Sequence, residues 1–297
     1  MSVAESRNPD LAATQAPAKM RTMKALDIGG LILTLITVIF AVLWAFPIYW
    51  GVITSLKPES QVIAKTVEFL PRTWTIEAYW QVLVNTMIGR WYINSLITSL
   101  GVTAITLATS ALTAYALSQL RFPGRLVLWY LILASFMVPL TALIVNHFIL
   151  MAQLQLINNW MGVILPQLIH PVVIIVYKNF FDSVPKEYRE AAKMDSASEW
   201  RIFSRIYLPM NWGVTTALAI VTFIGAWNNF LWPFLAVSKP EMMNVAVGIT
   251  QVNDAFGVQY ARELAAAILA ALLVAVLYLI FQRRVTQAIM LSAGVKG

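Results

Sequence analysis

Cysteine is absent from the 297 residues, and only two histidines are present. The lack of Cys excludes disulfides, thiolate catalysis, thiolate zinc sites and iron–sulfur clusters. His147 and His170 have no carboxylates near them in the sequence, so they make a poor metal site. We interpret both as hydrogen-bonded interhelical or interfacial histidines rather than as metal ligands or proton relays, and we predict that the chain binds no metal and no cofactor.

Two motifs that carry chemistry are also missing. No stretch has the G-x-x-x-x-G-K-[ST] spacing that cradles phosphates, so the chain has no ATPase site of its own. No G-x-S-x-G elbow exists, which argues against a Ser-His-Asp hydrolase. We predict no catalytic residues and expect that the chain is not an enzyme.

Charge is scarce and apolar residues are abundant. Only 12% of the residues are charged and 59% are hydrophobic, whereas soluble domains average about 25% charged residues because their surface must be solvated. This composition predicts a chain embedded in a lipid bilayer. The net charge of +7 is explained by membrane topology, and we expect no nucleic acid partner.

Six apolar stretches have about the length that crosses a hydrocarbon core, and none of them contains Asp, Glu, Lys or Arg. They are residues 31–55, 93–118, 126–146, 161–177, 212–237 and 264–281. The predicted fold class is therefore an all-α membrane protein with six transmembrane helices. We divide it into an N-terminal tail (1–30), a six-span domain (31–281) and a C-terminal tail (282–297).

The basic residues indicate the orientation. The two tails and the loops 119–125 and 178–209 hold fifteen Lys and Arg residues, and the other loops hold six. Because cytoplasmic loops are enriched in Lys and Arg, both tails should be cytoplasmic. The absence of charged residues inside the spans argues against an ion-coupled carrier, which usually carries ionisable groups there.

Several prolines lie within or beside the spans, where each removes a backbone hydrogen bond and kinks the helix. Kinks suit a protein that moves. Proline is also simply commoner in membrane helices than in soluble ones, so both interpretations stay open.

The cytoplasmic loop 182–209 is predicted to contain two short helices. Ser183, followed by Pro185 and two glutamates, is typical of a helix N-terminus, and that helix should run to about Met194. Ser196 and Glu199 have the spacing of a capping box for a second helix. The bend between the two helices carries small residues, so another protein could approach it closely. The alternative is an amphipathic pair lying on lipid headgroups.

The residues of this loop resemble a known motif. Glu190, Ala191, Ala192, Asp195 and Ala197, followed by an Ile-Tyr-Leu-Pro segment, are similar to the EAA loop of permease subunits in ABC importers. The resemblance extends to the segments 114–125, 227–233 and 293–297 and covers residues 25 to 297. These segments resemble the carbohydrate-uptake branch, in particular the smaller maltose-type permease subunit.

The resemblance implies a function and partners. The loop would insert into a cleft on a cytoplasmic ATP-binding subunit, and closure of two such subunits would drive alternating access of the spans. The coupling residues would be Glu190, Ala191, Ala192, Asp195, Ser196 and Ala197. The other implied partners are a homologous second permease and an extracytoplasmic solute-binding protein, in the plasma (inner) membrane of a prokaryote.

The sequence departs from the family pattern at Ser196, where relatives usually have Gly. A serine there would be strained if the bend needed a positive φ. We favour the alternative in which Ser196 is an N-cap in the β region, because that conformation stores no strain.

A substrate path is a further hypothesis. Asn228 and Asn229 offer amides beside the aromatic rings of Trp227 and Trp232, which suits the hydroxyls and ring faces of a sugar. Helix–helix hydrogen bonding with an interfacial aromatic belt explains the same residues and is the favoured interpretation. The sequence as a whole predicts a carbohydrate permease of an ABC importer, with an ion-coupled secondary carrier or a membrane scaffold as alternatives.

Overall fold

The computed structural model describes residues 28–252 and 257–292, and the side chains of residues 283–292 are outside that description. The described part is helical and contains no β-strand, as the predicted all-α class requires. The chain divides into two compact units, Met1–Ile48 and Tyr49–Gly297. The described residues of the first unit belong to the start of α1 (Ile28–Ser55).

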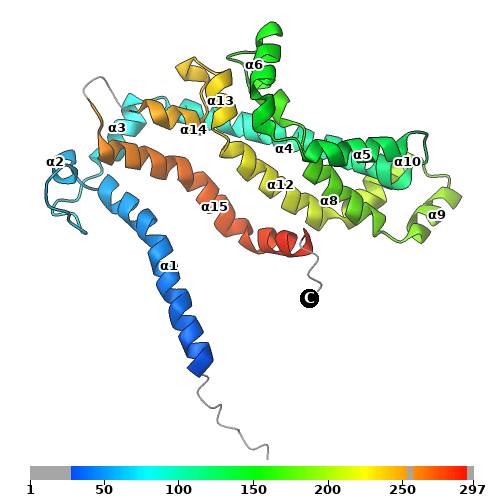
Figure 1. Cartoon of the computed structure of the whole chain (residues 1–297), viewed down its shortest axis with the longest axis horizontal. Coiled ribbons are helices and arrows are strands. Elements are labelled where there is room, and N and C mark those ends of the chain that lie inside the picture. The colour runs from blue at the N-terminus through cyan, green and yellow to red at the C-terminus, as the bar shows by residue number, and fades with distance from the viewer. Residues whose placement is uncertain (1–27, 253–256, 293–297) are drawn as a thin grey trace, which may run out of the picture. The chain divides into compact units, whose positions relative to one another are not determined.

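The second unit begins with the end of α1 and continues through a succession of helices, labelled in Figure 1. They are α2 (Glu59–Val62), α3 (Glu77–Asn85), α4 (Ile88–Gln119), α5 (Arg125–Phe136), η1 (Leu140–Leu143), α6 (Ile144–Gln153), α7 (Trp160–Ile164), η2 (Leu165–Gln167), α8 (Pro171–Asp182), α9 (Lys186–Met194), α10 (Glu199–Ile202), η3 (Phe203–Tyr207), α11 (Leu208–Met210), α12 (Trp212–Trp227), α13 (Leu231–Ala236), η4 (Pro240–Met242), α14 (Val245–Gly248), η5 (Ile249–Gln251) and α15 (Tyr260–Ser292).

Three helices of the described residues are long and apolar enough to cross a bilayer by themselves: α1, α4 and α15. Three bent pairs also qualify if each is counted as one span. They are α5 with residues 140–153, residues 160–167 with α8, and residues 199–210 with α12, bent by 92°, 54° and 78°. The chain is thus a multi-helix membrane protein with several apolar spans.

Helix breaks interrupt three stretches that were expected to be continuous, and the first two of these breaks are bends of the pairs above. The stretch 126–146 breaks after Phe136, and Pro139 precedes the next turn. The stretch 161–177 breaks before Pro171, the first residue of α8. The stretch 212–237 breaks after Trp227, where three residues separate α12 from α13. Proline causes two of these breaks, because it cannot donate the hydrogen bond that a continuous helix needs.

The last helix extends beyond the apolar stretch that predicted it. The predicted tail 282–297 begins inside a helix, since α15 continues to Ser292. Uniform apolar composition marked only residues 264–281, and Arg283 and Arg284 ended the apolar stretch without ending the helix. Hydropathy marks only the part of a helix that lies in the hydrocarbon core of a bilayer. The helix itself can continue through charged residues, because its backbone hydrogen bonds do not depend on apolar side chains.

Helix α4 passes through both buried cores of the second unit and packs against α8 and α12 (Figure 1). Its N-terminal half contributes Ile88 and Trp91 to one core, together with α12, α13, α14 and α15. Its C-terminal half contributes Leu107, Ala114 and Tyr115 to the other, together with α8 and with α10 and η3 of the loop 182–209. One helix therefore connects the two cores.

Small hydroxyl side chains line the buried face of α4. Ser95, Ser99, Thr103, Thr106 and Ser110 are all buried, and the Thr103 hydroxyl donates to the Ser99 carbonyl oxygen at 2.7 Å. Small residues let neighbouring helices approach closely, which is how helices associate inside a membrane. The sequence of α4 thus explains why two other helices pack along it.

The outer segment 238–252 is attached to the start of α4. The Asn94 amide nitrogen donates to the Glu241 and Met243 carbonyl oxygens at 2.9 and 2.8 Å, and the Ser95 hydroxyl accepts from the Val245 amide at 2.8 Å. Buried polar groups need such partners. These bonds fix the segment 238–252 on the same helix whose other end meets the loop 182–209.

Candidate coupling loop and interior cavity

The first helix of the loop, α9, begins later than its sequence signature indicated. Its N-cap is Pro185, which makes no side-chain cap bond. Ser183 instead ends α8: it has helical backbone angles, and its hydroxyl donates to the Phe180 carbonyl oxygen at 2.7 Å. The prediction that Ser183 caps α9 was wrong, because its hydroxyl is hydrogen-bonded to a carbonyl oxygen of the preceding helix, α8, instead of an amide of α9.

The bend after α9 is a left-handed helix C-cap centred on Ser196. Ser196 has a φ of +54°, its amide donates to the Lys193 carbonyl oxygen, and the Ala197 amide donates to the Ala192 carbonyl oxygen, both at 3.0 Å. This pair of bonds is the Schellman motif, which places one residue in the left-handed region. The favoured prediction of an N-cap in the β region was therefore wrong.

The usual glycine of the family matches this conformation, and the serine tolerates it at a cost. A non-glycine residue in the left-handed region is destabilised by contact of its Cβ with the backbone. The motif also brings together Ala192 and Ala197, which pack against the core of the second half of α4. Small apolar residues at these two positions are thus required by the bend itself.

The second helix, α10, is capped by Ser198. The Ser198 hydroxyl accepts from the Arg201 amide at 3.4 Å, and Ser198 has extended backbone angles. The capping box expected between Ser196 and Glu199 is absent, because Ser198 is the N-cap and Glu199 is therefore the first residue of α10 rather than the third. After α10 the backbone continues through the π-helical turn η3, whose Phe203 and Tyr207 are buried.

The loop presents a mixed edge to its surroundings. Glu190, Ala191, Asp195 and Ser196 are exposed, while Ala192 and Ala197 are half-buried. Two large apolar side chains beside this bend are also exposed, Met194 to 86% and Trp200 to 66%. All six predicted coupling residues therefore lie at one bend, four of them accessible and two of them supporting it.

Glu199 is the electrostatic centre of the loop and was not predicted as a site residue. Its carboxylate accepts from the Tyr115 hydroxyl at 2.7 Å and pairs with Arg189 at 2.7 Å and Lys193 at 3.4 Å. Burial raises the pKa of this carboxyl, but the Tyr115 hydroxyl and the two cations outweigh burial, so its pKa lies below the usual value. Glu199 is thus a carboxylate that remains ionised at neutral pH.

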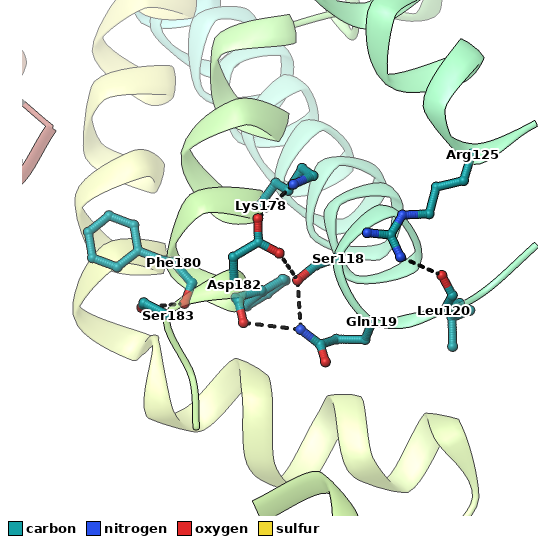
Figure 2. A network of polar contacts seen from close by, with 9 residues as sticks. Ser118, Gln119, Leu120, Arg125, Lys178, Phe180, Asp182 and Ser183 are labelled. Atoms are coloured by element: carbon teal, nitrogen blue, oxygen red, sulfur yellow. Dashed lines mark hydrogen bonds and ion pairs between the residues drawn. The ribbon is translucent and has the colours of Figure 1, made fainter. Parts of the chain in front are cut away.

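A second polar group joins the start of the loop to the end of α4 (Figure 2). The Ser118 hydroxyl donates to the Asp182 carboxylate at 2.6 Å, and Lys178 pairs with the same carboxylate at 2.6 Å. Gln119 donates to the Phe181 carbonyl oxygen at 3.2 Å and accepts from the Tyr207 hydroxyl at 2.8 Å. Ser118 and Gln119 lie in the segment 114–125, which resembles the family, but no local pattern showed which helices they would join.

A cavity of about 470 Å³ lies beside the helix breaks near Pro139, Pro171 and Asn229. Its polar lining includes Gln167 from η2 and Asn229 from the break between α12 and α13. The Asn229 amide nitrogen donates to the Gln167 side-chain oxygen at 2.6 Å. Both histidines, His147 and His170, also line the cavity.

The structure separates the three residues predicted for a substrate path. Asn229 lines the cavity, whereas Asn228 is exposed and does not belong to its lining. Trp227 is buried at 2% exposure and stacks on Phe223 with a centroid distance of 5.9 Å. Trp232 lines the cavity instead. A helix break between Trp227 and Trp232 decides which side chains point inward, and no periodic pattern could have located it.

The bend geometry generates a prediction for Ser196→Gly. Glycine removes the Cβ contact of the left-handed conformation, so the bend should become more stable by about 1 kcal/mol. Amide hydrogen exchange should then show slower exchange for the loop peptides of the purified protein.

Ser198→Gly is the matched control. Ser198 has a φ of −69° and caps α10 with its hydroxyl, so the same replacement should speed exchange or leave it unchanged. Equal slowing in both variants would contradict the assignment of strain to Ser196.

Comparison with known proteins agrees with this geometry. Residues 107–289 match the family model described as binding-protein-dependent transport system inner membrane component. The chain is 30% identical over 269 residues to the arabinooligosaccharides transport system permease protein AraQ of Bacillus subtilis, covering 89% of this chain and 95% of that protein. It is 32% identical to the sulfoquinovosyl glycerol transport system permease protein SmoH of Agrobacterium fabrum, covering 85% and 89% of the two chains.

A solved structure shares the fold. A chain of a bacterial ABC transporter involved in the import of the acidic polysaccharide alginate superimposes with a TM-score of 0.79 and 23% identity, covering 86% of this chain and 96% of that one. The resemblance found in the sequence to permease subunits of binding-protein-dependent importers is thereby confirmed. The chain belongs to the family of binding-protein-dependent transport system inner membrane components, whose members are transport subunits and not enzymes.

Proposed function

We propose that this chain is a permease subunit of an ABC importer that translocates a carbohydrate or a related polyol. The family implies a partner ATPase, a second permease and a solute-binding protein. In the proposed assembly, two copies of the ATP-binding subunit serve this chain and a homologous permease. The solute moves by alternating access and is not changed chemically.

The single observation that carries the coupling role is the exposed bend between α9 and α10. Four of its predicted coupling residues are accessible, and the adjacent Met194 and Trp200 expose large apolar side chains. Exposed aromatic and Met side chains beside charged residues are typical of protein interfaces. The bend therefore supports docking to the ATP-binding subunit better than docking to lipid headgroups.

The carbohydrate class is supported by relatives and by the cavity. Two of the relatives are named for arabinooligosaccharides and sulfoquinovosyl glycerol. The cavity offers the amides of Asn229 and Gln167 beside the ring of Trp232. Amide groups suit sugar hydroxyls, and an aromatic ring suits a sugar face.

The proposed topology has six spans, counting each bent pair as one, with both termini cytoplasmic in the inner membrane of a prokaryote. The predicted domain boundaries 1–30, 31–281 and 282–297 remain part of this proposal. The excess of Lys and Arg in the loop 178–209 supports its cytoplasmic location. An ion-coupled carrier is not favoured, because the family consists of binding-protein-dependent transport components.

The mechanism uses the broken helices. Discontinuous spans place irregular backbone beside a cavity, where neighbouring groups can satisfy it. The breaks near Pro139, Pro171 and Asn229 lie beside the cavity. ATP-driven movement of the loop would tilt the inner halves of these spans and open the path to the cytoplasm.

The function predicts the outcome of Glu190→Ala in a reconstituted complex. Receptor-stimulated ATP hydrolysis should fall by about tenfold, the typical size of a coupling free energy between two sites. Ala191→Trp, a bulky change on the same exposed edge, should have the same effect. Glu77→Ala removes an exposed carboxylate from α3, far along the chain from the loop, and should leave stimulation unchanged. Normal stimulation in both loop variants would contradict the coupling role.

The adjacent asparagines provide a second test. Asn229→Leu removes a cavity amide and should raise the KM for solute about tenfold, the loss expected for one buried hydrogen bond. Asn228→Leu, one residue away and outside the cavity, should leave the KM unchanged. Transport assays of both variants in proteoliposomes would measure this, and equal effects would remove Asn229 from the substrate path.

A further inference from the structure

Helix α9 lies on the protein with little apolar attachment. None of its residues is buried, although α9 carries the exposed Glu190 and Ala191 at the proposed docking edge. The helices on either side are different, since Phe181 of α8 and Ile202 of α10 are both fully buried. The orientation of α9 must therefore depend on its C-terminal bend and on polar contacts.

Those polar contacts converge on one carboxylate. Arg189 and Lys193 lie one helical turn apart on α9, and both pair with the same Glu199 oxygen, at 2.7 and 3.4 Å. The Arg189 side chain is only 20% exposed, so this ion pair is less screened by water than a surface pair. Glu199 thus joins the N-terminal end of α10 to two residues of α9 that lie one helical turn apart.

The other oxygen of Glu199 reaches α4. It accepts from the Tyr115 hydroxyl at 2.7 Å. The Tyr115 ring is 4% exposed and contacts the rings of Phe203 and Tyr207, at centroid distances of 5.3 and 5.2 Å. Because this packing fixes the ring, the hydroxyl is a donor with a fixed position.

Two other hydrogen bonds join α4 to the loop 182–209 without involving Glu199. Ser118 holds Asp182, and Gln119 holds the Tyr207 hydroxyl (Figure 2 shows the first). These links attach the beginning and the end of the loop to α4. Neither of these two hydrogen bonds is made with a residue of α9, so they do not orient α9 as the ion pairs of Glu199 do.

We propose that Glu199 is a positioning residue that fixes α9 relative to the last turns of α4, so that displacement of α9 by the ATP-binding subunit moves α4. The inference rests on the proposed function. The contacts form one cluster: the cations of α9 pair with the Glu199 carboxylate, that carboxylate accepts from the Tyr115 hydroxyl, and Arg189 also interacts with the same hydroxyl. Loss of either contact should uncouple transport from ATP hydrolysis, so that ATP is hydrolysed with less solute imported.

The test uses Glu199→Gln, Tyr115→Phe and the double variant in the full complex, reconstituted in proteoliposomes with its solute receptor. Glu199→Gln removes the ion pairs with α9 and retains an acceptor for Tyr115, whereas Tyr115→Phe removes only the link to α4 and retains the packed ring. The measured quantity is solute imported per ATP hydrolysed. Each single variant should lower it by about tenfold, the loss expected for a hydrogen bond to a charged group.

The double variant distinguishes positioning from general weakening. Contacts of one shared cluster predict that the double variant loses less than the product of the two single losses, while independent structural damage predicts that the two losses multiply. Tyr130→Phe is the control: it removes the same hydroxyl from an exposed tyrosine on α5 and should keep the wild-type ratio.

The outcomes separate the two proposals. If the wild-type complex shows no receptor-stimulated hydrolysis, the proposed function fails regardless of Glu199. If wild type is stimulated and Tyr115→Phe keeps its import ratio, the positioning role of Glu199 is overturned and the function stands. Because the phenylalanine ring preserves the core, Tyr115→Phe decides this even if Glu199→Gln does not assemble.

Discussion

The packing of α4 through two cores is the constraint on which the rest of the structure depends. Its small hydroxyl residues let α8 and α12 approach, its first turns fix the outer segment through Asn94 and Ser95, and its last turns meet the cytoplasmic loop. The segment 238–252 and the loop 182–209 are therefore attached to opposite ends of one continuous helix. In a transport subunit, this continuity connects the side that receives solute with the side that receives energy.

The sequence was sufficient for the class of protein and for the position of the loop. Scarce charge and long apolar stretches predicted an all-α membrane protein, and the loop residues from Glu190 to Ala197 identified the family that the comparisons show. These features are local or compositional, because a bilayer selects for apolar composition whatever the tertiary packing. The two short loop helices could also be predicted, because helix-start signals are local, although Ser183 and Ser196 are not the residues that cap them.

Backbone conformation and long-range contacts were not accessible in this way. Ser196 is compatible with an N-cap by residue type, and only the bonds from Ala197 to Ala192 and from Ser196 to Lys193 reveal a Schellman bend. The inward position of Asn229 and the outward position of Asn228 depend on a helix break. The Glu199–Tyr115 contact joins residues 84 positions apart, and nothing in either local sequence marks it.

The central claim is that α9 and the end of α4 move as one body. Because the chain contains no cysteine, spin labels can be placed at Glu187→Cys on α9 and at the exposed Leu112→Cys on α4. Pulsed electron paramagnetic resonance should give the same distance between these two labels in nucleotide-free and ATP-bound complexes. Distances from α9 to the ATP-binding subunit should change. A distance between the two labels that shifts on ATP binding would contradict the account.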